Sequence, residues 1–213
     1  GGHHIKSHYE RTDRIIKERI RPCIRAARAV DISVVYAPSP KIARSYPQWV
    51  RYAGWADMDL KKNDVTQDEW PPSKYRQAEG KYSSLRRRDN EKMGNYHGPL
   101  PAWWHIKDIA SSIAPSDGDF VVATGSQLHR LLRHRGLVHL IYAGFAANIC
   151  LVYRDYGLQA MRARGYLPML LRDCTTAIET RDTFPELSLT ESVIRDLERW
   201  FPTTDSAEFI SAC

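Results

Sequence analysis

The chain has 213 residues, a formal net charge of +6 and a hydrophobic content of 43%. This length suits one large domain, and the hydrophobic content is enough to fill its core. No apolar run approaches the roughly 20 residues of a membrane-spanning helix, and the polar N-terminus lacks the apolar segment of a signal peptide. We therefore expect a cytoplasmic protein without a membrane partner.

The positive charge is dispersed, which argues against a nucleic-acid partner. The longest pure basic run is Arg86-Arg87-Arg88, and acidic residues interrupt the remaining positive charge. The four cysteines, at positions 23, 150, 174 and 213, show neither CxxC nor zinc-finger spacing. The GxGxxG and Walker A motifs are also absent, so we expect no disulfide framework, no metal site and no nucleotide cofactor.

The first two elements are expected to be a helix and a strand. From Ser7, which can cap the helix, apolar residues recur at helical spacing as far as Ala27, and Cys23 falls on the apolar face. Pro22 is expected to kink or split this helix, because proline has no N–H to donate. Residues 32–37 are rich in β-branched side chains and predict a strand, which a Pro-Ser-Pro segment ends.

Residues 38–105 form an irregular insertion, rich in proline, aromatic and charged residues and without sustained periodicity. So long a connection within a compact domain is typical of a lid, a binding loop or a subunit contact. Its tryptophans can line a pocket or pack the insertion onto the domain, and packing is their more common use.

Regular elements resume after the insertion. Residues 120–124 predict a strand that Gly125 ends, and Ser126 can cap the helix that follows. Towards the C-terminus, residues 183–200 predict the last helix, and Phe209-Ile210 indicates a short edge strand or a tail packed on the body.

A strand–helix–strand unit organises the C-terminal half. Residues 140–143 and 167–171 are short apolar runs typical of strands buried on both faces. A helix is predicted between them over about residues 149–164, with Gly165 at its C-cap. Because such βαβ units form parallel sheets, the fold class is expected to be α/β.

Cys150 lies in the first turn of this helix, at the carboxyl end of a strand, where open α/β sheets bind ligands. The positive end of the helix dipole and the free backbone N–H groups favour the nucleophilic thiolate and can stabilise an oxyanion. The alternative is a buried structural cysteine, which is the more common role of a lone cysteine in an apolar segment. Cys174, at the end of the next strand, is a rival thiol for which packing is expected.

Three motifs in this half resemble those of the isochorismatase-like cysteine hydrolases. The family pattern is a strand, G-[VF]-A-[TA]-N-x-C, a helix with A-x-x-x-G-[YF], a second strand and D-[AC]-x-[AT]. The matching positions are Gly144 to Asn148 with Cys150, Gly165-Tyr166, and Asp173 with Thr176-Ala177. Ala160 stands one residue further from Gly165 than the family pattern has it.

The resemblance implies a single domain over residues 1–213, a three-layer α/β/α fold and a parallel sheet of about five to six strands. It implies that Cys150 is the nucleophile and that a non-proline cis peptide from Ala146 points the N–H of Ala147 into the oxyanion hole. The implied enzyme needs no cofactor, acts on a small molecule and forms homo-oligomers. The candidate substrate-binding residues are Asn148, Tyr36, Trp104 and His105.

The sequence departs from the family pattern in two places. Members carry their general base, an Asp, on an earlier central strand; no matching element occurs, so we expect an upstream first strand outside this chain. Members also carry a catalytic Lys where this sequence has Ala123 and Thr124. Lys41, Lys107 and His105 are candidate replacements, although each is more typical of an ordinary surface or loop residue.

The resemblance favours a hydrolase that cleaves a carbon–nitrogen bond other than a peptide bond, in a small amide, carbamoyl or ureido compound. The reaction would pass through a thioester on Cys150. The alternative is a protein of the same fold that keeps the pocket and the thiol but is non-catalytic or redox-responsive, which the missing Lys favours.

Overall fold

The computed structural model describes residues 3–49, 74, 79–85 and 108–213. Within these residues, no helix is both long and apolar enough to cross a bilayer. Most of the predicted insertion over residues 38–105, including Trp104 and His105, lies outside the described residues.

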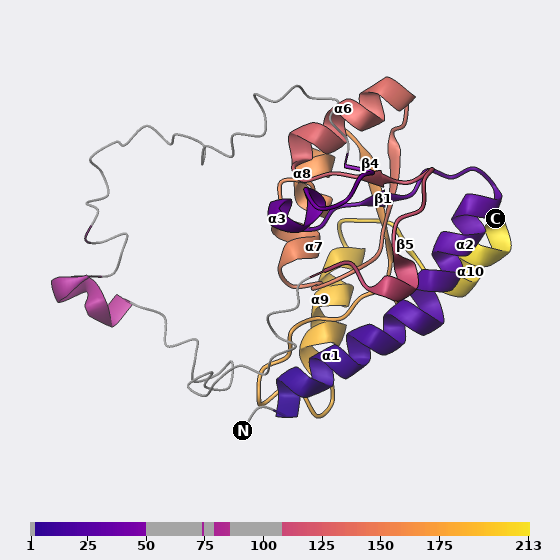
Figure 1. Cartoon of the computed structure of the whole chain (residues 1–213). Helices are drawn as coiled ribbons and strands as arrows, with labels where there is room; N and C mark the ends of the chain where they lie inside the picture. The colour runs from indigo at the N-terminus through magenta and orange to yellow at the C-terminus, as the bar shows by residue number, and fades with distance from the viewer. Residues whose placement is uncertain (1–2, 50–73, 75–78, 86–107) are drawn as a thin grey trace.

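All strand pairs among the described residues are parallel, and helices cover both faces of the strands, so the α/β class is confirmed. The strands form a two-stranded sheet, β1-β2, and a three-stranded sheet in the order β3-β4-β5 (Figure 1). Their bounds are β1 Val35–Tyr36, β2 Phe120–Val121, β3 His139–Tyr142, β4 Leu167–Leu171 and β5 Thr203–Thr204.

The predicted strand–helix–strand unit is confirmed by the pairing of β3 with β4. His139 lies opposite Leu167, and Tyr142 opposite Leu170, in parallel register. β5 then adds to the far edge of β4, with Leu170 opposite Thr203. The short apolar runs thus form the two strands that the sequence predicts, and β4 is largely buried. The predicted burial of the first run on both faces is wrong for the described structure, since Ile141 of β3 is 44% exposed.

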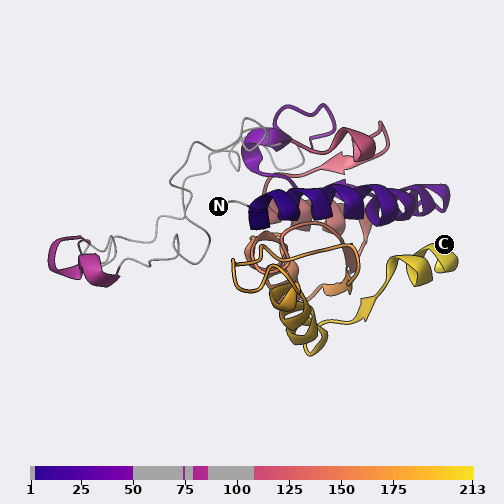
Figure 2. The ribbon, with the colours of Figure 1, turned by 90° about the horizontal axis from the view of Figure 1, so that it is seen from below.

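One face is covered by a long N-terminal helical segment. It comprises α1 (His3–Ile15), the π-helix η1 (Ile16–Ile20) and α2 (Arg21–Ala29). Pro22 neither kinks the segment sharply nor ends it: the chain stays helical, and the five π-helical residues precede the proline, which sits in the first turn of α2. Figure 2 shows this segment running across the molecule, with β2 on one side of it and α9 and α10 on the other.

The other face is covered by α6 (Gly125–Arg135), α7 (Cys150–Tyr153), α8 (Leu158–Ala163) and α9 (Ser188–Glu198). The predicted helix over residues 149–164 is therefore two short helices, because the chain turns at Arg154–Gly157. Their fully buried side chains include Leu131, Leu158, Met161 and, from β4, Leu170. Truncating any one of these to alanine would cost about 2–5 kcal/mol.

The two sheets lie side by side between these helix layers. Ile24 of α2 packs against the core of both sheets, and the core around α6 includes Val35 of β1 and Leu140 of β3. β2 pairs with β1 on one edge and with Trp49 on the other. Among the described residues, β1 and β3 therefore each keep one unpaired edge, and the expected single sheet is divided into two.

The C-terminal end differs from the prediction. Phe209-Ile210 is neither a strand nor a tail but part of the helix α10 (Ser206–Ala212), and the strand is the preceding Thr203–Thr204. The side chain of Asp205 accepts a hydrogen bond from the N–H of Glu208 and caps α10. This Asp-x-x-Glu spacing is a helix-start signal present in the sequence.

Candidate active site

Cys150 is half-buried and follows β3 at the carboxyl end of the sheet, as the sequence predicts. It is the first residue of α7, which has only four residues. A helix this short carries little dipole, so the stabilisation that a long helix would give the thiolate does not apply here. Any such stabilisation must come from other groups around the thiol.

The loop from Gly144 to Ile149 arranges backbone N–H groups beside Cys150. Gly144 adopts a φ of 127°, in the region that favours glycine, and the non-proline cis peptide joins Phe145 to Ala146. The prediction placed this bond one residue later, from Ala146 to Ala147. The N–H of Ala147 donates to the carbonyl of Thr176 at 3.0 Å, so it is not the free oxyanion donor that the sequence suggested.

Two other N–H groups beside the thiol form no hydrogen bond within the described part of the chain. Among the described residues, no acceptor faces the backbone N–H of Asn148 or of Cys150. The side chain of Asn148 is engaged instead: its amide donates to the carbonyl of Ile178 at 3.2 Å and accepts from the N–H of Ile178 at 3.0 Å. Asn148 therefore ties this loop to residues 174–180, and the predicted substrate contact through its side chain is not supported.

The turn between α7 and α8 crosses the carboxyl ends of several strands. Asp155 accepts a hydrogen bond from the N–H of Gly125, after β2, at 2.7 Å. Tyr156 donates to the carbonyl of Pro38, after β1, at 3.3 Å, and its own carbonyl accepts from the Tyr142 hydroxyl of β3 at 2.7 Å. Three strand ends thus fix the position of this turn.

Arg154, in the same turn, interacts with Cys150. A side-chain hydrogen bond to Cys150 raises the pKa of the Arg154 guanidinium, and the charges of Tyr156, Cys150 and Asp155 add to this effect. Sequence reasoning missed this arginine, although it stands four residues after Cys150, a spacing that places two side chains on one side of a helical turn.

The positions where the family carries its Lys have a structural role in this chain. Thr124 caps α6, and its side-chain oxygen accepts from the N–H of Gln127 at 3.2 Å. Ala123 is buried. The cap is therefore Thr124 and not the predicted Ser126. Lys41 is exposed in α3 (Pro40–Ala43), and Lys107 lies outside the described residues.

The hydroxyl of Tyr36 has a partner on the N-terminal helical segment. It accepts from Arg28 at 3.3 Å, and Arg28 forms an ion pair with Asp119, which directly precedes β2. The Tyr36 hydroxyl therefore points to the amino end of the sheet, away from Cys150. Burial raises the pKa of Tyr36 to about 12. The predicted substrate contact at Tyr36 stays a prediction, although its hydroxyl already has Arg28 as a partner.

The other thiols differ from Cys150 in burial. Cys23 and Cys174 are both in the core between α2 and β4, as predicted, and burial raises the pKa of each. Cys213 is half-buried at the end of α10. Cys150 is thus the one cysteine beside the strand ends that is accessible to reagents.

A buried polar network supports the loop that Cys150 depends on. Glu179 accepts hydrogen bonds from the N–H groups of Leu189 and Thr190 and caps α9. Arg11 of α1 donates to the Thr176 hydroxyl at 3.4 Å and to the carbonyl of Ala177 at 3.5 Å. Because the carbonyl of Thr176 holds the N–H of Ala147, α1 and α9 together position the Cys150 loop.

His8 of α1 lies against this network, and we expect it to make stability depend on pH. Burial, with the charge of Arg11, lowers the pKa of His8 from 6.5 to about 4. Between these two pH values the unfolded chain binds a proton at His8 that the folded chain does not. The contribution of His8 to the unfolding free energy is therefore full above pH 6.5 and is lost as the pH falls towards 4. One such proton changes the unfolding free energy by at most about 1.4 kcal/mol per pH unit.

Urea unfolding at pH 7.5 and at pH 5 measures this effect. We expect His8→Gln to lose less stability than the wild type between the two conditions, and His139→Gln, at an exposed position of β3, to behave like the wild type. Equal losses in the wild type and His8→Gln would contradict the assignment to His8.

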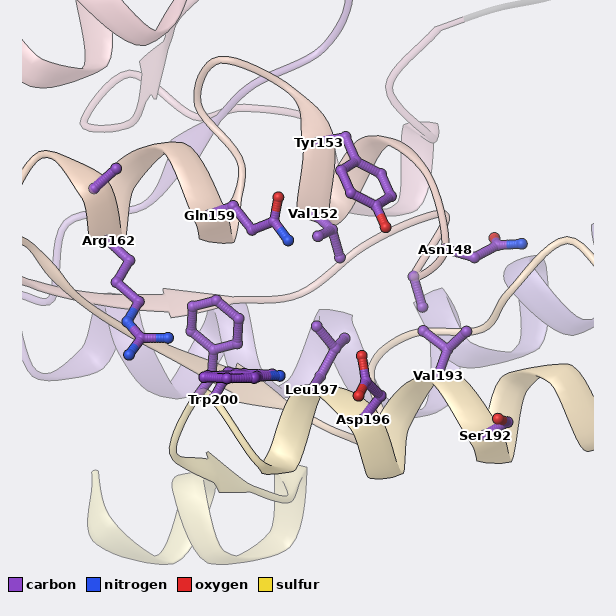
Figure 3. Close-up of a pocket in the computed structure, with 13 residues that line it drawn as sticks. Asn148, Val152, Tyr153, Gln159, Arg162, Ser192, Val193, Asp196, Leu197 and Trp200 are labelled. Carbon is purple, nitrogen blue, oxygen red and sulfur yellow. The ribbon is translucent and has the colours of Figure 1, made fainter.

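A cavity of about 800 Å³ lies beside this loop, between α7, α8 and α9 (Figure 3). Its lining includes Ala147 and Asn148 but not Cys150. Arg162 and Trp200 lie together at one end, with the guanidinium carbon 5.7 Å from the centre of the Trp200 ring. The cavity adjoins the back of the loop without containing the thiol.

No protein-family model matches the sequence, and no curated protein matches it. The structure is similar to that of a cysteine hydrolase from Pseudomonas syringae pv. phaseolicola 1448A, with a TM-score of 0.52 and 19% sequence identity over 90% of this chain and 76% of that chain. An isochorismatase family protein from Desulfovibrio vulgaris subsp. vulgaris str. Hildenborough aligns with 20% identity and a TM-score of 0.39 over 50% of this chain and 55% of that chain. At this identity the first likeness shows the fold, which is isochorismatase-like, as the motifs around Cys150 indicate.

Proposed function

We propose that this chain, which has the fold of the isochorismatase-like cysteine hydrolases, is a hydrolase that cleaves a carbon–nitrogen bond of a small amide, carbamoyl or ureido compound. The observation that carries the proposal is the accessible Cys150 thiol beside the free backbone N–H groups of Asn148 and Cys150. A thiol and oxyanion donors at one place are the groups that acyl transfer requires.

In the first step, the sulfur of Cys150 attacks the substrate carbonyl carbon as a thiolate, and the carbonyl oxygen becomes an oxyanion. The N–H groups of Cys150 and Asn148 stabilise that oxyanion. The carbon–nitrogen bond then breaks, the nitrogen leaves with a proton as ammonia or an amine, and a thioester remains. Water attacks the thioester in the second step, which releases the acid and restores the thiol.

Both steps need a general base, for the thiol proton and then for the water. We propose that a carboxylate on a further strand between β1 and β3 supplies it. In the part of the chain that the structure describes, β1 and β3 each keep an unpaired edge, and this supports the proposal because unpaired backbone inside a covered sheet is costly. The carboxyl end of such a strand would lie beside Cys150.

A substrate screen tests the function. Simple amides, carbamoyl compounds and ureido compounds are incubated with the protein, and released ammonia is measured alongside the intact mass of rapidly quenched protein. We expect ammonia release for at least one class and a mass increase equal to the acyl group on Cys150. If every class gives neither ammonia nor an adduct, the fold serves a non-catalytic role, which the capping function of Thr124 in place of a Lys would favour. Homo-oligomer formation stays a prediction, to be tested by light scattering.

A further inference from the structure

The cavity between α7, α8 and α9 has the size and the lining of a small-molecule site. Its volume of about 800 Å³ falls within the range of ligand pockets, about 300–1,000 Å³. The buried side chains of Val152 and Leu197 and the exposed ring of Tyr153 supply apolar lining. Such pockets orient a ligand through a few polar groups set into an apolar lining. The charged residues of the cavity therefore indicate which ligand it fits.

Arg162 is a cation held at one end of the cavity. Its guanidinium carbon lies 5.7 Å from the centre of the Trp200 ring and 5.5 Å from the centre of the Phe201 ring. Such cation–π contacts hold the guanidinium in place without using its N–H donors. Arg162 forms no ion pair within the described part of the chain. Its planar fork of donors is thus suited to bind the carboxylate of a ligand.

Asp196 is the matching anion on the opposite wall. Figure 3 shows its carboxylate directed from α9 into the cavity, towards which Arg162 reaches from α8. Asp196 stands about one helical turn, a rise of about 6 Å, before Trp200, whose ring Arg162 contacts. No described cation pairs with Asp196, and the neighbouring Arg195 pairs with Glu191 at 3.6 Å. The cavity thus presents one positive and one negative group about a helical turn apart along α9.

This charge pattern selects a class of ligand. A simple anion bound at Arg162 would also meet the like charge of Asp196, and a simple cation bound at Asp196 would meet that of Arg162, so each would bind less well. A zwitterion satisfies both groups. Because the two groups are so close, the carboxylate and the ammonium of the ligand must be close together as well, as they are on one carbon of an α-amino acid.

We propose that this cavity binds a free α-amino acid with an apolar side chain. The carboxylate of the ligand pairs with Arg162, its ammonium group pairs with Asp196, and its side chain packs against Val152 and Leu197. Binding is noncovalent. It goes beyond the proposed function and does not depend on it, because Cys150 does not line the cavity.

A titration of the full chain with L-phenylalanine, followed by saturation-transfer NMR of the ligand, tests the proposal. Phenylpropanoate, which lacks the amino group, and phenethylamine, which lacks the carboxylate, are the matched analogues. We expect L-phenylalanine to bind with a Kd of about 1 mM or below. Each analogue should bind at least about tenfold more weakly, because it loses a charge-assisted hydrogen bond and leaves one charged group facing it unpaired.

Three variants make the result specific, and all three positions are exposed. Arg162→Gln and Asp196→Asn should each weaken L-phenylalanine binding about tenfold. Arg162→Gln should not weaken phenethylamine binding, and Asp196→Asn should not weaken phenylpropanoate binding, because those analogues lack the group concerned. Arg195→Gln is the matched control: it removes a positive charge from α9 that pairs with Glu191 and does not line the cavity, so binding should stay at the wild-type level.

The opposite outcomes are equally clear. The proposal is overturned if L-phenylalanine shows no saturation transfer up to about 10 mM, or if Arg162→Gln binds it as tightly as the wild type. If phenylpropanoate binds the wild type as tightly as L-phenylalanine, Asp196 takes no part and the amino-acid class is wrong. The analogues test this on the wild type, so the result stands even if a variant fails to fold. None of these measurements involves the Cys150 thiol, so failure here leaves the hydrolase intact and the reverse also holds.

Discussion

Replacement of Cys150 by serine is expected to lower hydrolysis of the best substrate by at least about a thousandfold. A serine hydroxyl is not ionised at neutral pH, so it is a much weaker nucleophile than a cysteine thiolate. The acyl-enzyme mass should disappear in the same variant. Steady-state ammonia release and the quenched intact mass measure the two effects.

Cys213→Ser is the matched control for this substitution. Cys213 is also half-buried, but it ends α10, far along the chain from the loop of Gly144 to Ile149. This variant should retain the wild-type rate. If Cys150→Ser keeps more than a tenth of the activity, the nucleophile is another group and the thioester mechanism is wrong.

Gly125→Ala is expected to destabilise the fold by about 3 kcal/mol or more, or to prevent folding. A Cβ at this position would lie 2.0 Å from the carbonyl oxygen of Asp155 and 2.6 Å from its carbonyl carbon. Both atoms are backbone, so the clash can be relieved only by moving the turn between α7 and α8. Chemical denaturation followed by circular dichroism measures the loss.

The same substitution at Gly118 gives the comparison. No atom lies within 4 Å of a Cβ built there, so Gly118→Ala should change the unfolding free energy by less than about 1 kcal/mol. If the two variants have the same unfolding free energy, the backbone of Asp155 does not lie against Gly125.

The sequence by itself determined the class of the fold and the place of the thiol. The apolar runs at residues 140–143 and 167–171 are long enough for one strand each, and the spacing between them predicts helix, so the parallel pair β3-β4 is expected. Cys150 then falls at a strand end. These conclusions depend only on the pattern of residues close together in the sequence, and such a pattern is enough to predict strands and helices.

The tertiary structure decided which side chains meet. Asn148 and Tyr36 are polar residues near the strand ends, and only the fold shows that Ile178 and Arg28 already bind them. Glu179 and Arg11 gave no local signal, because the Arg11 contacts span about 165 residues of sequence.

The division of the predicted helix over residues 149–164 into α7 and α8 could not be predicted from the sequence either. Helical periodicity continues through residues 149–164, and the break at Arg154–Gly157 arises from hydrogen bonds to Gly125 and Pro38, far away in the chain. Long-range packing therefore overrides local helix propensity at this turn.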